Sequence, residues 1–368
     1  MAKPKNASLQ LTWQKANPES RKLGHCRIVV VGVGGAGNNT VTRLMQMSID
    51  GAECIAINTD EQHLKATRAT YKVLIGEGTT KGFGAGGDPA VGKAAMKESK
   101  ERVAKLLKNV NVVFVATGLG GGTGTGAAPM VADIARQNGA IVVGVVTMPF
   151  RIEKGRLKHA RRGLVELRKA CETVVVVDNN RLVKAAGQLP LNEAFKVADQ
   201  VLANMIRGIV ETISAPSLIN LDFADFKTIM RKGGLAVVGV GESDAPDRAE
   251  EAVHNALSDP LSDIDYEGAS GALIHICGDE QMTVEEANRV GELVTEMMKD
   301  NATVIWGARV NPSLAGMLEV TLVMTGVQPP RLTEGIGTIA PNLFNIDPYG
   351  GPEKPFAVDL GLDQLENF

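Results

Sequence analysis

Residues 120–126 read GGGTGTG, and this run limits the possible folds more than any other segment. It stands between an apolar, β-branched segment that ends at Ala116 and an apolar helical pattern over Ala127–Gln137. A low-complexity linker is not expected between a buried strand and an apolar helix. Successive small residues let backbone N–H groups form a concave nest for an anion, and two threonine hydroxyls add donors. The run therefore predicts a phosphate-binding loop.

Strand and helix patterns alternate on both sides of this loop. Strands buried on both faces of a parallel sheet lack polar alternation. Apart from their terminal residues, the same is true of Arg27–Val31, Glu53–Ile57, Asn111–Ala116, Ala140–Thr147 and Thr173–Asp178. The longest helical pattern covers Glu193–Ser214, where apolar residues recur every three to four positions. Beyond it, strand patterns at 235–240, 272–277, 303–310 and 318–324 accompany helical patterns at 246–257 and 283–299.

These patterns predict an α/β fold with a Rossmann-like parallel-sheet domain, a long central helix and a second, smaller α/β domain. We expect a flexible extension at residues 1–24, a nucleotide-binding domain at 25–190, the central helix at 191–215, the second domain at 216–327, and a proline-rich linker with a tail at 328–368.

Composition argues against several other classes of protein. Hydrophobic residues make up 44% of the 368 residues and charged residues 22%, which is typical of a globular chain. The net charge of −3 argues against a nucleic-acid partner. No apolar run reaches the ~18–20 residues of a spanning helix, and no secretory signal opens the chain. The four cysteines form no CxxC pair, so we expect reduced thiols in a cytoplasmic protein without membrane insertion.

Two further glycine motifs are less specific. Gly32, Gly34 and Gly37 form a GxGxxG after a strand, which with Asp60 fits a dinucleotide site and fits a simple packing turn equally well. Residues 87–94 approach a P-loop but end in Ala94, where Mg²⁺ binding needs Ser or Thr. We interpret Lys93 as a solvated helix residue, next to a glycine loop that could close over a nucleotide.

Together these motifs resemble the tubulin superfamily and, within it, the FtsZ family of cell-division GTPases. The resemblance covers residues 26–327 through GVGGAGNNTV at 32–41, NTDEQ at 58–62, GAGGDP at 84–89, GLGGGTGTGAAP at 118–129, TMPF at 147–150 and NLDFAD at 220–225. The VIWGAR segment at 304–309 resembles archaeal members more than bacterial ones.

The resemblance implies a site for GTP or GDP, with Mg²⁺ neutralising the triphosphate through ligands that stay unassigned. The implied nucleotide-binding residues are Gly34, Gly35, Ala36, Gly37, Asn38, Asn58, Gly84, Ala85, Gly86, Gly121, Gly122, Thr123, Gly124, Thr125, Glu153, Arg156 and Asn179. Glu153 and Arg156 match a ribose-side pair, although their spacing of three is one less than in bacterial members. The alternative for their segment, which holds eight Lys or Arg between 151 and 169, is a solvated basic helix face.

Phe195 and Asp199 are assigned to the base. Four residues apart on a helix, they share one face, so a ring could stack on guanine while a carboxylate accepts its N1–H and N2–H. Adenine presents an acceptor at N1 and would be repelled. Family members often have Asn at the position of Asp199. The alternative is a core phenylalanine beside a surface charge.

Asn220, Asp222 and Asp225 are the candidate catalytic residues. The two aspartate carboxylates could polarise a water for attack on a γ-phosphate, or the three residues could merely cap a helix over residues 225–232. In the FtsZ family this loop enters the nucleotide site of the next subunit. The resemblance therefore implies a head-to-tail homopolymer, because such a heterologous contact repeats into an open filament.

The implied function is GTP-dependent self-assembly at the mid-cell division ring. Leu360, Leu362, Leu365 and Phe368 could dock on a membrane-anchoring adaptor, as tails of this family do, or could belong to a disordered end. Two alternatives stay open. An NAD-dependent oxidoreductase leaves residues 120–126 and NLDFAD without a role, and a non-hydrolysing GTP-binding regulator does not need both Asp222 and Asp225.

Overall fold

The computed structural model describes residues 26–180, 190–214, 218–219, 223–231, 233–258, 269–299 and 301–327. The first six strands pair in parallel in the order β3-β2-β1-β4-β5-β6. They are β1 Ile28–Val33, β2 Ala52–Asn58, β3 Tyr71–Leu74, β4 Val112–Gly118, β5 Ile141–Met148 and β6 Thr173–Asp178. The five strands expected in this half are confirmed. The sequence did not reveal β3, because it is only four residues long and mostly half-buried.

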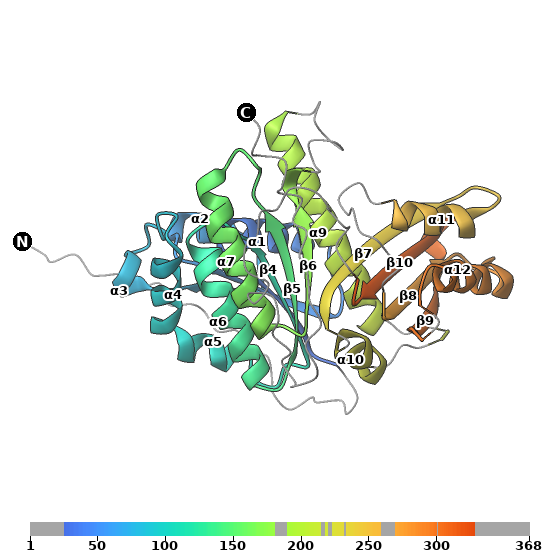
Figure 1. The fold of residues 1–368 in the computed structure, drawn as a ribbon, viewed down its shortest axis with the longest axis horizontal. Coiled ribbons are helices and arrows are strands. Elements are labelled where there is room, and N and C mark those ends of the chain that lie inside the picture. Colours follow the sequence, from blue (N-terminus) through green and yellow to red (C-terminus); the bar gives the residue numbers. More distant parts are fainter. Residues whose placement is uncertain are drawn as a thin grey trace, which may run out of the picture.

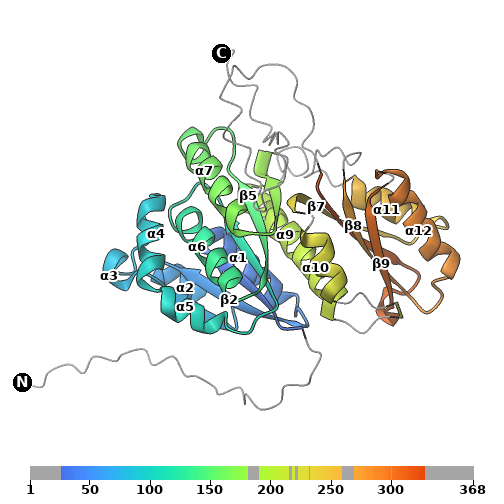
Figure 2. The ribbon, with the colours of Figure 1, turned by 60° about the horizontal axis from the view of Figure 1, so that its bottom comes forward.

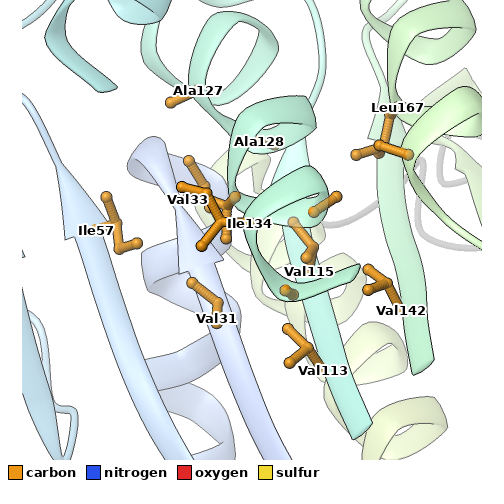
Figure 3. Close-up of a cluster of buried hydrophobic side chains, with 14 of the residues drawn as sticks. Val31, Val33, Ile57, Val113, Val115, Ala127, Ala128, Ile134, Val142 and Leu167 are labelled. Atoms are coloured by element: carbon orange, nitrogen blue, oxygen red, sulfur yellow. The ribbon is translucent and has the colours of Figure 1, made fainter. Parts of the chain in front are cut away.

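Helices cover both faces of this parallel sheet (Figures 1 and 2). One face packs against α4 Pro89–Glu98, α5 Lys100–Leu106, α6 Thr123–Gln137 and α7 Lys154–Ala170, and the other against α1 Gly34–Gln46 and α9 Leu191–Ser214. The short helices α2 Glu61–Ala66 and α3 Glu77–Thr80 flank β3 in the sequence. Figure 3 shows Val31, Val33 and Val115 beneath α6, as their complete burial requires. Because the strands are covered twice, their sequences lack polar alternation.

The second half builds a smaller sheet in the order β7-β10-β8-β9, in which β10 runs antiparallel to both of its neighbours. Its elements are β7 Gly234–Ser243, α11 Arg248–Leu257, β8 Gly271–Gly278, α12 Val284–Glu296, β9 Thr303–Val310, the 3₁₀ turn η2 Pro312–Leu314 and β10 Leu318–Thr325. Helices α11 and α12 cover one face, while α9 and α10 Phe223–Arg231 contribute to the core on the other. The predicted α/β fold with a second, smaller α/β part is confirmed.

One ten-stranded sheet joins the two halves. Residues Thr173, Val174 and Val175 of β6 pair in parallel with Gly234, Leu235 and Ala236 of β7. This pairing was not predicted, because strand patterns do not specify which strand pairs with which across about 60 residues of intervening chain. None of the helices in the described ranges combines the length and apolar character that crossing a membrane needs.

The central helix α9 runs from the side of the parallel sheet where the strands end, the carboxyl edge, to the opposite side, where the strands begin (Figure 2). Near its N-terminus Phe195 contacts Phe150, which follows the carboxyl end of β5. At its C-terminus the Ser214 side chain fills the space beside Gly51, immediately before β2. A 24-residue helix is about 36 Å long. Elements that follow α9 are therefore carried away from the edge where the strands end.

Candidate functional site

Two helix N-termini meet at the carboxyl edge of neighbouring strands β1 and β4. Helix α1 begins at Gly34 and α6 at Thr123, and a Cβ added to Gly34 would lie 2.9 Å from the Gly124 nitrogen. The predicted phosphate loops are therefore largely the first turns of these helices. First turns carry unsatisfied N–H groups and the positive end of the helix dipole. Two converging N-termini make this edge suitable for an anion.

Most glycines in these two turns are needed for close packing. A Cβ on Gly37 would overlap the Ala116 carbonyl oxygen, and a Cβ on Gly122 would lie 2.8 Å from both Ala85 Cβ and the Asp88 nitrogen. Gly35, by contrast, has no atom within 4 Å of such a Cβ, and Gly121 has only Arg156 Nη2 at 3.8 Å. Close packing therefore explains only some of the glycines in each turn. Gly35 and Gly121 leave the open surface that a phosphate could approach.

The threonine hydroxyls of the signature turn have partners within the protein. Thr123 Oγ1 lies 2.6 Å from Thr59 Oγ1, and the Gly120 N–H donates to Thr125 Oγ1 (2.8 Å). Thr123 and Thr125 therefore tie the turn to the end of β2 and close it on itself. Because Thr125 Oγ1 accepts in this contact, its own hydrogen stays available to an anion. Thr59, which is completely buried, was missed. Its place directly after Asn58 at a strand end was the available signal.

Asn38 and Asn58 lie beneath the turns, with 0% and 3% of their surfaces exposed. In the amide orientation that satisfies its neighbours, Asn38 Nδ2 donates to the Gly32 carbonyl (2.9 Å) and its Oδ1 accepts from Asn58 Nδ2 (3.1 Å). Asn58 Oδ1 accepts from the Thr59 N–H (2.9 Å). The structure thus places these two side chains where they position β1, α1 and β2, away from the open surface.

The glycine loop at residues 82–88 closes against both neighbouring turns. The Gly84 N–H donates to the Thr59 carbonyl (3.2 Å), and buried Ala85 packs on Gly122. Gly86 has a φ of +58° and no atom within 4 Å of an added Cβ. Gly87 shares both features, with a φ of +80° and no atom within 4 Å, so Gly86 and Gly87 are the open positions of this loop.

The two weaker motifs have structural roles. Asp60 Oδ1 accepts from the His63 N–H (2.9 Å) and caps α2, so this carboxylate does not behave as the ribose-binding acid of a dinucleotide site. In the near P-loop, Lys93 is an exposed residue of α4, as expected. A Cβ on the preceding Gly92 would overlap the Gly122 carbonyl oxygen, because α4 packs closely on α6.

The expected ribose-side residues lie next to the signature turn. Arg156 forms an ion pair with Glu153, whose Oε1 also accepts from the Phe150 N–H (3.1 Å). The Arg156 guanidinium lies over Gly121. Asn179 Oδ1 is buried and has no hydrogen-bond partner among the described residues. A buried acceptor without a partner is unusual and marks a place where a ligand could donate.

Phe195 and Asp199 lie at the same end of α9. The Phe195 ring is 41% exposed and meets Phe150 edge to face, with ring centroids 5.7 Å apart. Burial raises the pKa of Asp199 to about 6, and the neighbouring Arg43 of α1 partly opposes this shift. The face between α9 and α1 thus offers an aromatic edge and a partly desolvated carboxyl group. Phe150 was missed as a site residue, although it lies in the TMPF segment.

Asp225, the catalytic candidate that the structure describes, does not lie with the glycine turns. Asp225 is in the first turn of α10, while Asn220 and Asp222 fall outside the described residues. Helix α10 ends at the opposite edge of the sheet, where Thr173 Oγ1, at the start of β6, donates to the Met230 carbonyl (2.9 Å). A single chain therefore does not bring Asp225 to its own phosphate-binding turns.

Comparison with known proteins assigns both halves of the chain. Residues 27–187 match the GTPase domain of the Tubulin/FtsZ family, and residues 234–328 match the FtsZ family C-terminal domain. The chain belongs to the Tubulin/FtsZ family. It is 52% identical to cell division protein FtsZ 2 of Methanocaldococcus jannaschii, over 84% of this chain and 83% of the relative. It is 46% identical to FtsZ 1 of Thermococcus kodakarensis, over 92% of this chain and 89% of the relative.

Solved structures agree with this FtsZ assignment. An FtsZ dimer from M. jannaschii superimposes with a TM-score of 0.78 at 48% identity, covering 85% of this chain and 95% of that one. A protofilament of CetZ2 from Haloferax volcanii shares the fold, with a TM-score of 0.69 at 23% identity. The resemblance to FtsZ, including its archaeal character, is confirmed. The chain is a GTPase of this family, and both alternatives, the oxidoreductase and the non-hydrolysing regulator, are rejected.

Proposed function

We propose that this FtsZ-family chain polymerises head-to-tail with GTP and hydrolyses the nucleotide where two copies meet. The observation that carries the proposal is the separation of the two halves of the catalytic site. The phosphate-binding turns lie at the carboxyl edge of the parallel sheet, and α10 with Asp225 lies towards the opposite edge. A second copy stacked in the same orientation would bring its α10 end against the end of the first copy that carries the phosphate-binding turns. Such a heterologous contact repeats into a filament.

In this proposal the first half of each copy binds the nucleotide. The N–H groups of the α1 and α6 first turns receive the phosphates, with Gly35, Gly86 and Gly121 providing close approach. Arg156 and Glu153 contact the ribose side, and the unpartnered Asn179 Oδ1 accepts from the ligand. Phe195 packs on the base while ionised Asp199 accepts from guanine.

Mg²⁺ fits this site only as a companion of the triphosphate. Among the described residues no group of three or more His, Cys, Asp or Glu side chains is arranged to hold a metal. Mg²⁺ commonly keeps several waters and binds phosphates with one or two protein ligands. When bound, it would neutralise charge on the phosphates. The chain's own residues position the nucleotide around it.

The second half of the active site comes from the next copy. Asp222 and Asp225 of that copy polarise the attacking water, and Asn220 helps to position it. Hydrolysis then weakens the contact and permits disassembly. The first half, residues 25–190, acts as the nucleotide domain, and residues 216–327 act as the domain that completes its neighbour's site.

Turnover measured against protein concentration tests this function. Because the site is completed by contact, GTP hydrolysed per molecule should rise steeply above a critical concentration that coincides with light scattering. Replacement of Asp225 by alanine should reduce turnover by roughly 10²–10⁴-fold, the usual effect of losing acid–base assistance, while GTP affinity measured by calorimetry is retained. Full-rate hydrolysis by dilute, unassembled protein would refute the shared site.

We further propose that the protein acts at the division ring through its tail. Leu360, Leu362, Leu365 and Phe368 supply apolar contacts for a membrane-anchoring adaptor. A chain ending at residue 358 should keep its GTPase activity and fail to be retained by an adaptor that retains the full chain. Equal retention of both chains would place the adaptor site elsewhere.

A further inference from the structure

The small net charge of −3 conceals a strong segregation of charge along the chain. Residues 26–180 contain 21 Lys and Arg against 13 Asp and Glu, whereas residues 233–327 contain 4 against 17. In the second segment all four basic residues and 12 of the acidic ones are described by the structure. The half that holds the phosphate-binding turns is therefore basic, and the half beyond α9 is acidic.

Part of the acidic surplus gathers at one end of the second sheet. Ser243, the last residue of β7, and Gly278, the last of β8, both lie beside Leu318 of β10. The residues that follow these two strand ends include four exposed acids that form no ion pair with another described residue. We call them the acidic edge: Asp244, Asp247, Glu280 and Glu285.

The acidic edge adjoins the segment that leads to the catalytic acids. Gly278 also pairs with Val310 of β9 and accepts from the Asn311 N–H (2.8 Å). Two residues earlier in β9, Ala308 bridges to Ile219. Residue 219 directly precedes Asn220 and lies three residues before Asp222 in the chain. Any contact that presents the catalytic segment to another copy therefore brings the acidic edge close to that copy.

A complementary stripe runs along α7. Lys154, Lys158, Arg161 and Arg162 are exposed, and none forms an ion pair with another described residue. Their spacing of three to four places them on one side of the helix, which we call the basic face. Like charges at this spacing destabilise an isolated helix. The basic face begins directly after Glu153, at the ribose side of the nucleotide site.

We propose that the acidic edge of one copy faces the basic face of the next, so that filament growth is electrostatically steered. The inference rests on the proposed head-to-tail function and identifies the surfaces that guide it. Complementary charges raise association rates by 10- to 10³-fold at low ionic strength. The same charges oppose contacts between two first halves or between two second halves. The arrangement therefore favours polar, head-to-tail association over other pairings.

Charge reversal on either surface tests the proposal. The basic-face variant carries Lys158→Glu and Arg162→Glu, and the acidic-edge variant carries Glu280→Lys and Glu285→Lys. Each variant alone should bind GTP as the wild type does but need at least a tenfold higher concentration to assemble. An equimolar mixture of the two should assemble again, because each supplies the charge that its neighbour lacks. A matched control with Lys97→Glu and Lys100→Glu changes the net charge equally, at the exposed junction of α4 and α5, and should assemble normally.

Ionic strength gives a second readout on the wild-type protein. The screening length falls from about 30 Å at 0.01 M salt to about 10 Å at 0.1 M, so the elongation rate should fall several-fold over this range and the control variant should follow it.

Unchanged assembly of both reversal variants, or equal loss in the control, would overturn the proposal while leaving GTP-dependent assembly intact. Normal assembly of the basic-face variant with loss of binding to anionic lipid vesicles would assign that face to a membrane and also overturn it. Absence of any GTP-dependent assembly in the wild type would refute both proposals.

Discussion

In the proposed nucleotide site, the environment of Asp199 controls the charge of the group that accepts from guanine. Its pKa is raised to about 6 because burial disfavours the charged form, although Arg43 nearby favours it. Guanine donates from N1 and N2, so only the ionised carboxylate can accept both hydrogens. This pKa lies above the ordinary value near 4, so ionisation of Asp199 lowers the stability of the fold. The destabilisation is absent below about pH 4 and reaches its full size above about pH 6.

Lowering the pH through 6 should therefore weaken GTP binding. A group with a pKa near 6 is mostly ionised at pH 7 and mostly protonated at pH 5, so affinity should fall about tenfold between them. Titration of the phosphate groups contributes in the same range, so the matched control is Asp199→Asn, which cannot titrate. Replacement by alanine should cost about 1.5–3 kcal/mol of binding free energy at pH 7. Calorimetry with identical pH profiles for the wild type and Asp199→Asn would exclude this role.

At the scale of the element, the signature turn holds tightly packed and open glycines within a few residues of each other. A Cβ at Gly126 would overlap the Pro89 carbonyl oxygen and lie 2.7 Å from the Lys93 nitrogen, so it would separate α6 from α4. A Cβ at Gly121 meets nothing closer than 3.8 Å. The two positions therefore separate the structural contribution of the turn from its ligand contribution.

The same substitution at these two glycines should affect different properties, namely fold stability at Gly126 and GTP affinity at Gly121. Gly126→Ala should destabilise the fold by about 1–3 kcal/mol, the cost of overpacking. Gly121→Ala should change stability by less than about 0.5 kcal/mol and weaken GTP binding at least tenfold, because its methyl group projects into the open surface. Denaturant unfolding and nucleotide titration of both variants are the measurements. A stable Gly126→Ala protein, or a Gly121→Ala protein with normal affinity, would contradict this division.

At the scale of the whole molecule, α9 holds the two halves together through a tight and partly polar contact. Gly208 lies against Thr321 of β10, where an added Cβ would be 2.9 Å from the Thr321 side chain. The adjacent Arg207 of α9 forms an ion pair with Glu319 of β10, with 3.6 Å between Arg207 Nη2 and Glu319 Oε2. Thr321 Oγ1 and the adjacent His275 Nε2 are buried without a hydrogen-bond partner among the described residues. The contact is therefore sensitive to small changes in spacing.

Replacement of Gly208 by alanine should loosen this contact. The substitution favours helix by up to about 1 kcal/mol, but the clash with Thr321 should outweigh that gain and lower the free energy of unfolding. Gly291→Ala in α12 is the matched control, because nothing lies within 4 Å of its added Cβ and it should be neutral or stabilising. Because Gly208 is remote from the nucleotide turns, GTP affinity should persist in both. Gly208→Ala unfolding at the same denaturant concentration as Gly291→Ala would contradict the prediction.

The sequence alone determined the order and type of most elements. Apolar β-branched segments, helical periodicity and glycine-rich turns are local properties of the sequence, so they can be recognised without knowledge of the fold. They identified the strands now labelled β1, β2, β4, β5 and β6, the long helix α9 and the four strands of the second half. The motif at 120–126 also located the turn that opens α6 and, by resemblance, the family.

Only the tertiary structure decided which positions of the turns are open and which hold the turns in place. The pairing of β6 with β7, the burial of Asn38 and Asn58, and the contact of Thr59 with Thr123 all join residues far apart in the chain. Local patterns carry no information about such partners, because a buried amide and a ligand-binding amide have the same sequence. The separation of Asp225 from the phosphate turns likewise depends on the direction of α9, since a helix of about 36 Å carries the following chain to the other edge of the sheet.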